Sequence, residues 1–261
     1  MDIGGQSALI TGGAGGLGGA AARRLAALGV HVVVFEPDGA RARAFAAEIG
    51  NATGVAGDHT DEASVLEAIA IAQAEGRFSI NVNAAGVAVI APATATAEGV
   101  PHDMAMFRNL IDIHLMGPFN VSRLCAAAFA GNEPDADGQR GLIVNTASTA
   151  AYDGQARQVG YSAGKGAIVS MALAMARDLA DIGVRSLAIA PGPIWTPRLS
   201  GAPESLKEAL ISNVAFPKRF GQPEEYAALV EAFLRTPFLN GQTVRLDGAM
   251  STPLTKLMGK P

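Results

Sequence analysis

Short apolar runs alternate along the chain with longer segments that favour helices. SALIT at 7–11 is followed by the glycine-rich turn GGAGGLG and by AAARRLAAL, so a strand, a turn and a helix are expected there. Further strands are predicted at 31–35, 53–57, 78–82, from 142 towards Ser148, at 184–190 and at 243–246. Further helices are predicted at 40–49, 62–75, about 104–130, about 160–182, 204–214 and 223–234.

This alternation of strand and helix predicts right-handed crossovers and a parallel sheet. We expect an α/β fold of the Rossmann type, with a doubly wound parallel sheet of seven strands and helices on both faces. No repeat or linker is visible, so residues 1–261 are expected to form a single domain. Gly117 and Pro118 should kink or break the long helix, because proline lacks a backbone N–H.

Composition narrows the classes of protein that this chain can represent. The 261 residues are 49% hydrophobic and carry a net charge of -4 without a basic run, so no nucleic-acid partner is expected. Cys125 is the only cysteine and cannot form an intramolecular disulfide. No charged leader and no stretch of about 18 apolar residues is present. We therefore expect a soluble, cytoplasmic protein with no membrane partner, and no cluster suggests a metal.

The segment after the fifth strand carries candidate acid/base chemistry. Ser148 ends the apolar run, and Tyr161 and Lys165 are four residues apart at the start of a predicted helix, on one face. An ammonium near a phenol favours the phenolate, so we expect a lowered pKa for Tyr161. Ser148 could hydrogen-bond the oxygen that gains or loses the proton. The alternative is an ordinary half-buried helical pair and a turn serine.

The glycine-rich turn predicts a nucleotide site. Thr11 and the glycines Gly12, Gly16 and Gly18, with Leu17 among them, form TGxxxGxG between a strand and a helix. Such a turn allows backbone to approach a pyrophosphate, whose charge suits the helix N-terminus. Alternatively, the glycines serve only close packing of strand and helix.

Glu36 at the end of the second strand bears on the choice of cofactor. A carboxylate there can accept hydrogen bonds from ribose hydroxyls and repels a 2′-phosphate, which favours NAD over NADP. Arg41 and Arg43 lie close and could in principle meet a phosphate instead.

Three more residues follow predicted strands at the same edge of the sheet. Asp58 could contact adenine or cap the next helix. Gly86, in the segment NAAG, allows backbone to pass close to the cofactor. Asn83 is a candidate cofactor residue, although hydrogen bonding within the sheet is the more favoured role.

Together these motifs resemble the short-chain dehydrogenase/reductase family over almost the whole chain. TGxxxGxG, NAAG, Ser148 with Tyr161-x-x-x-Lys165, and PGPIWTP occur in the family's order and spacing. Four further segments resemble one branch of the family, the type-2 3-hydroxyacyl-CoA dehydrogenases, which are also described as 17β-hydroxysteroid dehydrogenases of type 10. These segments are NEPDADGQRG, ARDLADIGVR, FPKRFGQPEEYAALV and PFLNGQTVRLDGA.

The resemblance implies roles for individual residues. Tyr161 would be the general acid/base, Lys165 would lower its pKa and bind the nicotinamide ribose, and Ser148 would steady the substrate oxygen. Ile194 and Thr196 match positions that bind the nicotinamide carboxamide, and Gln155 falls where the branch has a glutamine near the substrate. A surface role for Gln155 and a turn or cap role for Thr196 stay open.

One position departs from the branch pattern. IDIHLMGPFN carries His114 where the branch has an asparagine, the fourth catalytic residue, which holds a water in a proton relay. A histidine can also bond water and titrates near neutrality, so a relay could survive with altered pH dependence. Alternatively, His114 only packs in the helix.

The resemblance implies an NAD-dependent oxidoreductase that interconverts a secondary alcohol and its ketone. The branch suggests a 3-hydroxyacyl-CoA as substrate, and a hydroxysteroid or another hydrophobic alcohol is the alternative. The family usually forms homotetramers through two long helices. The His114 departure also leaves open a non-catalytic NAD-binding scaffold or sensor.

Overall fold

The computed structural model describes residues 3–86 and 91–251 and contains one parallel sheet of seven strands. The strand order is β3-β2-β1-β4-β5-β6-β7, so the chain winds outward from β1 in both directions and the predicted doubly wound sheet is confirmed. The strands are β1 (Gln6–Thr11), β2 (His31–Glu36), β3 (Ala52–Ala56), β4 (Arg77–Asn83), β5 (Gly141–Thr146), β6 (Val184–Pro191) and β7 (Thr243–Leu246).

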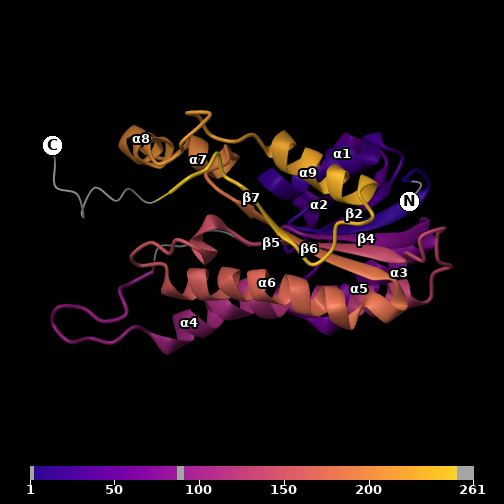
Figure 1. Ribbon diagram of the computed structural model, residues 1–261, viewed down its shortest axis with the longest axis horizontal. Coiled ribbons are helices and arrows are strands. Elements are labelled where there is room, and N and C mark those ends of the chain that lie inside the picture. Colours follow the sequence, from indigo (N-terminus) through magenta and orange to yellow (C-terminus); the bar gives the residue numbers. More distant parts are fainter. Residues whose placement is uncertain (1–2, 87–90, 252–261) are drawn as a thin grey trace.

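Helices cover both faces of the sheet, as the alternating pattern predicted (Figure 1). One face packs against α1 (Gly16–Ala27), α2 (Gly39–Ile49) and α9 (Pro223–Arg235). The other packs against α3 (Glu62–Ala74), α5 (Gly117–Ala130) and α6 (Val159–Asp178). Successive residues of β1 face opposite sides, since Ala8 and Ile10 join the first core and Leu9 joins the second.

The long helix predicted at 104–130 is present but is interrupted before Pro118. It consists of α4 (Met104–Ile111), a π-helical turn η1 (Asp112–Met116) and α5. The N–H of Gly117 donates to the carbonyl of Asp112, five residues back. Pro118 has no N–H with which to continue that pattern. The proline therefore marks the interruption, and the irregular turn itself carries residue 114.

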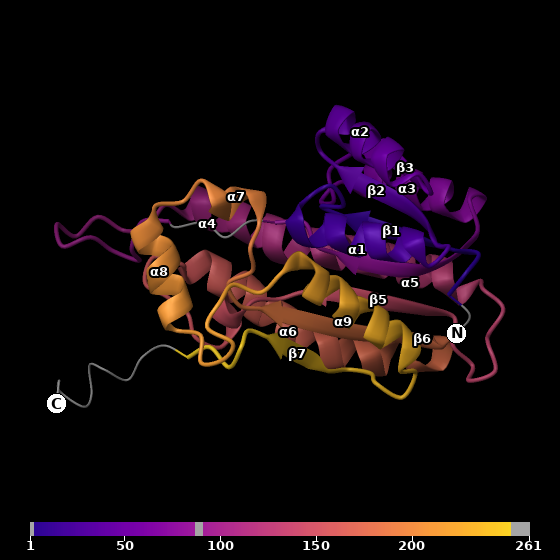
Figure 2. The ribbon, with the colours of Figure 1, turned by 90° about the horizontal axis from the view of Figure 1, so that it is seen from above.

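Two other segments differ from the predicted boundaries. The helix expected to run to Ile182 ends at Asp178, and a short 3-10 turn η3 (Ala180–Ile182) follows before Gly183 adopts a left-handed conformation. A short helix α7 (Pro197–Ser200), which the sequence analysis did not predict, precedes α8 (Glu204–Ser212). None of the nine described residues of α8 is fully buried, and Figure 2 shows α7 and α8 at one end of the molecule, beyond the sheet.

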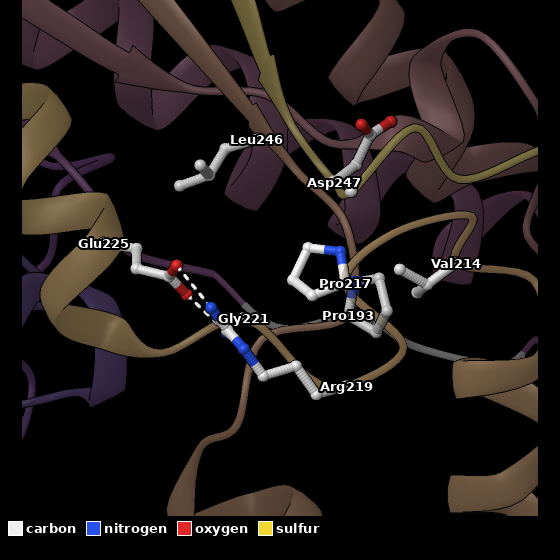
Figure 3. A pocket seen from close by; sticks show the side chains of 9 residues that line it. Pro193, Val214, Pro217, Arg219, Gly221, Glu225, Leu246 and Asp247 are labelled. Carbon is white, nitrogen blue, oxygen red and sulfur yellow. Dashed lines mark hydrogen bonds and ion pairs between the residues drawn. The ribbon is translucent and has the colours of Figure 1, made fainter.

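An ion pair fixes the chain where it returns from α8 to α9. The guanidinium of Arg219 binds the carboxylate of Glu225 through two hydrogen bonds of 2.9 Å. Glu225 also accepts the N–H of Gln222 at 2.7 Å, which closes the first turn of α9. The guanidinium and the Gln222 N–H hold the pKa of Glu225 at about 2. Figure 3 shows this pair at a cavity of about 140 Å³ beside Pro193 and Asp247.

Replacing Gly54 by alanine should destabilise the fold. A Cβ at Gly54 would overlap the backbone of Ala42 and Arg43, so α2 would have to move away from β3. We expect a loss of about 1 to 3 kcal/mol in the free energy of unfolding, measured by denaturant titration. Gly131→Ala is the control, because its Cβ would meet only the Ala128 oxygen at 3.6 Å. Equal stabilities of the two variants would contradict this packing argument.

Candidate active site

The carboxyl ends of the strands open onto one cavity of about 1700 Å³. Because the strands are parallel, residues that follow different strands meet at this edge. Of the predicted site residues, the following line the cavity: Gly12, Gly16, Leu17, Gly18, Glu36, Asp58, Gly86, Ser148, Gln155, Tyr161, Lys165, Ile194 and Thr196. His114 and Asn83 are buried and lie outside its lining.

Ser148, Tyr161 and Lys165 come together as the spacing predicted. Ser148 caps a 3-10 turn η2 (Thr149–Ala151), where its hydroxyl oxygen accepts the N–H of Ala150 at 3.1 Å. Its hydroxyl also hydrogen-bonds the phenol of Tyr161. Lys165 is buried one helical turn further on, with Nζ 5.9 Å from the centre of the Tyr161 ring. A hydroxyl, a phenol and an ammonium therefore share one corner of the cavity.

The predicted fall in the pKa of Tyr161 is wrong for this structure. Burial raises the pKa of the Tyr161 phenol, and the hydrogen bond with Ser148 opposes this only in part. The Lys165 ammonium donates to the carbonyl oxygen of Thr146 at 2.7 Å rather than to the phenol. Burial lowers the pKa of Lys165 itself to about 8. Desolvation thus outweighs the attraction on which the prediction relied.

His114 lies directly behind the Tyr161 ring. The two ring centres are 4.9 Å apart and the planes meet at 89°, an edge-to-face contact. Two glycines make this possible, since a Cβ at Gly164 would lie 2.8 Å from the His114 Cβ and a Cβ at Gly86 would lie 2.8 Å from its ring. The imidazole belongs to the π-helical turn η1 and is fully buried.

The glycine-rich turn has the features that a bound pyrophosphate requires. Gly15 is the N-cap of α1, no side chain caps the helix, and its first turn holds no acidic residue. The positive end of the helix, with the backbone N–H groups of its first turn, therefore faces the cavity. A Cβ at Gly18 would overlap the oxygen of Gly12, and a Cβ at Gly16 would lie 2.7 Å from Thr196 Cγ2. These residues fit a dinucleotide cofactor.

Glu36 and Asp58 border the same cavity at the ends of β2 and β3. The Glu36 carboxylate accepts the N–H of Ala14 at 2.9 Å, which holds it beside the glycine-rich turn. The guanidinium of Arg41 donates to the Ala14 carbonyl oxygen at 2.7 Å. One oxygen of Asp58 accepts the N–H of Thr60 at 2.8 Å, which lowers the pKa of Asp58. Asp61, not Asp58, caps α3.

Asn83 holds the sheet together rather than facing the cavity. Its amide nitrogen lies 2.9 Å from Oδ1 of Asn145 on β5 and 3.0 Å from Oγ of Ser122 on α5. Its backbone oxygen accepts from the Thr146 hydroxyl at 2.6 Å. Asn83 thus ties β4 to β5 and α5 just beneath the site, which is the structural role that the sequence analysis had favoured.

Residues from loops also line the cavity, among them Gln155 and Gln158. Trp195 lies outside this lining, with its ring 5.5 Å, centre to centre, from the Phe220 ring. Arg245 on β7 also lines the cavity and places its guanidinium 5.2 Å from the centre of the Tyr152 ring. Arg245 was not predicted from the sequence, because no local motif marks it and only the sheet order brings β7 beside β6.

His59 is a second cavity residue that the sequence analysis missed. It follows Asp58 at the end of β3, and its Nε2 lies 3.2 Å from the carbonyl oxygen of Ile113 in η1. An imidazole directly after a strand end was the available signal. Within residues 3–86 and 91–251 there is no cluster of histidine, cysteine or acidic side chains suited to a metal ion, and no helix long and apolar enough to cross a membrane.

Comparisons with known proteins show the family to which the chain belongs. A family model described as short chain dehydrogenase matches residues 6–206. The chain is 47% identical to 3-hydroxyacyl-CoA dehydrogenase type-2 of Homo sapiens, covering 94% of this chain and 95% of that protein. It is 44% identical to the Drosophila melanogaster protein of the same name, covering 93% and 96%.

A solved structure extends the likeness to three dimensions. The crystal structure of 3-hydroxyacyl-CoA dehydrogenase type-2 from Mycobacterium avium superposes with a TM-score of 0.93 at 41% identity, covering 95% of this chain and 97% of that one. The TM-score shows that the two proteins share the fold of the seven-stranded sheet. The chain belongs to the short-chain dehydrogenase family.

Proposed function

We propose that this protein is an NAD-dependent dehydrogenase that interconverts a secondary alcohol and its ketone, with a 3-hydroxyacyl-CoA as substrate. One observation carries the proposal: Ser148, Tyr161 and Lys165 share a cavity with an uncapped glycine-rich helix N-terminus. An acid/base group and a dinucleotide site in one cavity are the parts that hydride exchange with an alcohol needs. The names of the relatives support the choice of acyl-CoA.

The cofactor would lie along the carboxyl edge of the sheet. The backbone N–H groups at the start of α1 would hold the pyrophosphate, and Glu36 would accept from the adenosine ribose. Asp58 would face the adenine, and Lys165, Ile194 and Thr196 would hold the nicotinamide end. When bound, the nicotinamide supplies the acceptor or donor of the hydride.

Side chains of the protein would accept and donate the proton of the substrate hydroxyl. In oxidation Tyr161, as phenolate, takes the proton of the substrate hydroxyl, and in reduction it returns that proton to the oxygen. Ser148 hydrogen-bonds the same oxygen and stabilises its developing charge. The Lys165 ammonium favours the phenolate against the burial that raises the pKa of Tyr161. Gln155, at the cavity wall, would contact the substrate.

We also propose that residues 1–261 act as one domain within a cytoplasmic homotetramer. Exposed apolar side chains on the helices of one sheet face support assembly, among them Met116, Phe119 and Leu173. A reducing compartment suits Cys125, whose thiol is buried and has a pKa well above its ordinary value.

An activity panel tests the proposed function. We expect NADH formation with NAD and a 3-hydroxyacyl-CoA, and slower formation with hydroxysteroids and small secondary alcohols. Tyr161→Phe should lower kcat on the order of a hundredfold or more and leave the Kd for NAD unchanged, because it removes only the acid/base hydroxyl.

Tyr152→Phe is the matched control, since Tyr152 is half-exposed and lies outside the proposed proton path. If a hydroxysteroid were oxidised faster than the 3-hydroxyacyl-CoA, hydroxysteroids would become the proposed substrate class. An active Tyr161→Phe variant would overturn the acid/base assignment. NAD binding without oxidation of any alcohol would favour a scaffold or sensor.

Glu36 should make the enzyme prefer NAD. Its carboxylate would face a 2′-phosphate directly, so we expect kcat/KM with NADP to be lower on the order of a hundredfold. Glu36→Ala should bring the kcat/KM values for NAD and NADP closer together, because the repulsion between the carboxylate and the 2′-phosphate is removed. Glu67→Ala, an exposed change outside the cavity, is the control. Comparable kcat/KM values for NAD and NADP in the unaltered enzyme would refute the role of Glu36.

His114→Asn tests whether the buried imidazole takes part in proton transfer. Asparagine restores the residue that the family carries here, so we expect kcat to be kept or raised and its pH profile to shift. The profile is measured as kcat between mildly acidic and alkaline pH. Kinetics that are unchanged at every pH would remove His114 from the mechanism and leave it a packing role against Tyr161.

A further inference from the structure

The side chain of His59 joins two parts of the site that are distant in the sequence. His59 lies in the turn after β3, next to Asp58, and its Nε2 is 3.2 Å from the carbonyl oxygen of Ile113 in η1. Since a carbonyl oxygen only accepts, the imidazole proton must be on Nε2. Burial lowers the pKa of His59, and the Asp58 carboxylate and the hydrogen bond to Ile113 oppose this only in part.

In the π-helical pattern the Ile113 carbonyl would receive its backbone hydrogen bond from residue 118. Gly117 donates to Asp112, five residues back, and the next donor in that pattern would be residue 118. Residue 118 is proline and has no N–H. His59 supplies the hydrogen bond in its place. A carbonyl left unsatisfied when buried costs free energy, so this contact favours the π-helical form of the turn.

Two further contacts hold the imidazole in position. The Asn120 side chain donates to the backbone oxygen of His59 at 3.0 Å. A Cβ at Gly117 would overlap the His59 ring, so the ring occupies the space that a side chain at 117 would fill. His59 is therefore bound through both its ring and its backbone to the same helical segment.

That segment also presents His114 to the acid/base group. His114 is the next residue after Ile113, its Cβ packs over Gly164, and its ring contacts the Tyr161 ring edge-to-face. A change in the register of η1 would move His114, and the space behind Tyr161 would change with it. The shared turn thus links the end of β3 to the phenol.

We propose that His59 is a positioning residue: its hydrogen bond to the Ile113 carbonyl holds η1 in the register that places residue 114 behind the Tyr161 ring. This inference rests on the proposed dehydrogenase function. His59 does not reach the reacting atoms, and it acts on the reaction only through the turn.

A pair of variants of similar size tests the hydrogen bond. His59→Gln keeps an N–H donor at a similar reach, whereas His59→Met has a similar length and no donor. We expect His59→Gln to keep kcat within about threefold of the unaltered enzyme and His59→Met to lower kcat about tenfold, with a smaller change in KM for the acyl-CoA. A kcat that glutamine keeps and methionine lowers would show that the hydrogen bond is needed, because both side chains fill a similar space.

Hydrogen exchange of the amides at 112–117 gives a second readout that needs no activity. Exchange there should be about fivefold faster in His59→Met than in His59→Gln, because the turn opens more often without the bond. Equal exchange in the two variants, or equal kcat, would overturn the proposal. If no alcohol is oxidised by the unaltered protein, the proposed function fails, while the exchange contrast still decides whether His59 holds the turn.

Discussion

The burial of the Lys165 ammonium is the constraint on which the site depends. A charge taken out of water must be met by oriented dipoles, and here the carbonyl oxygen of Thr146 meets it at 2.7 Å. Thr146 is fixed in turn, because its hydroxyl donates to the Asn83 oxygen and contacts the phenol of Tyr226 at 2.8 Å. The end of β5, the sheet and α9 are thereby joined beneath a single ammonium group.

Much of the fold could be predicted from the sequence because its information is local. Apolar runs of strand length separated by helical segments define the order of elements, and the handedness of crossovers then gives a parallel sheet. The glycine-rich turn and the Tyr161 and Lys165 spacing were readable for the same reason. Each motif occupies one strand-turn-helix unit, so its geometry depends on neighbours in the sequence.

The features that escaped prediction depend on contacts between distant segments. Pro118 signalled an interrupted helix, but the register of η1 involves an imidazole more than fifty residues earlier in the chain. The pKa of Tyr161 depends on how deeply the phenol is buried, which spacing alone does not reveal. Arg245 likewise reaches the cavity only because the sheet order places β7 beside β6.

The separation of α8 from the sheet has a consequence for how the cavity wall can be altered. Ser148, Tyr161, Lys165 and the glycine-rich turn lie on the sheet and its flanking segments. None of the nine described residues of α8 is fully buried, although Leu206 and Leu210 line the cavity. No residue of α8 belongs to the three buried hydrophobic clusters of the described residues. Substitutions in α8 are therefore expected to change the wall of the cavity at Leu206 and Leu210 with little effect on the packing of the sheet.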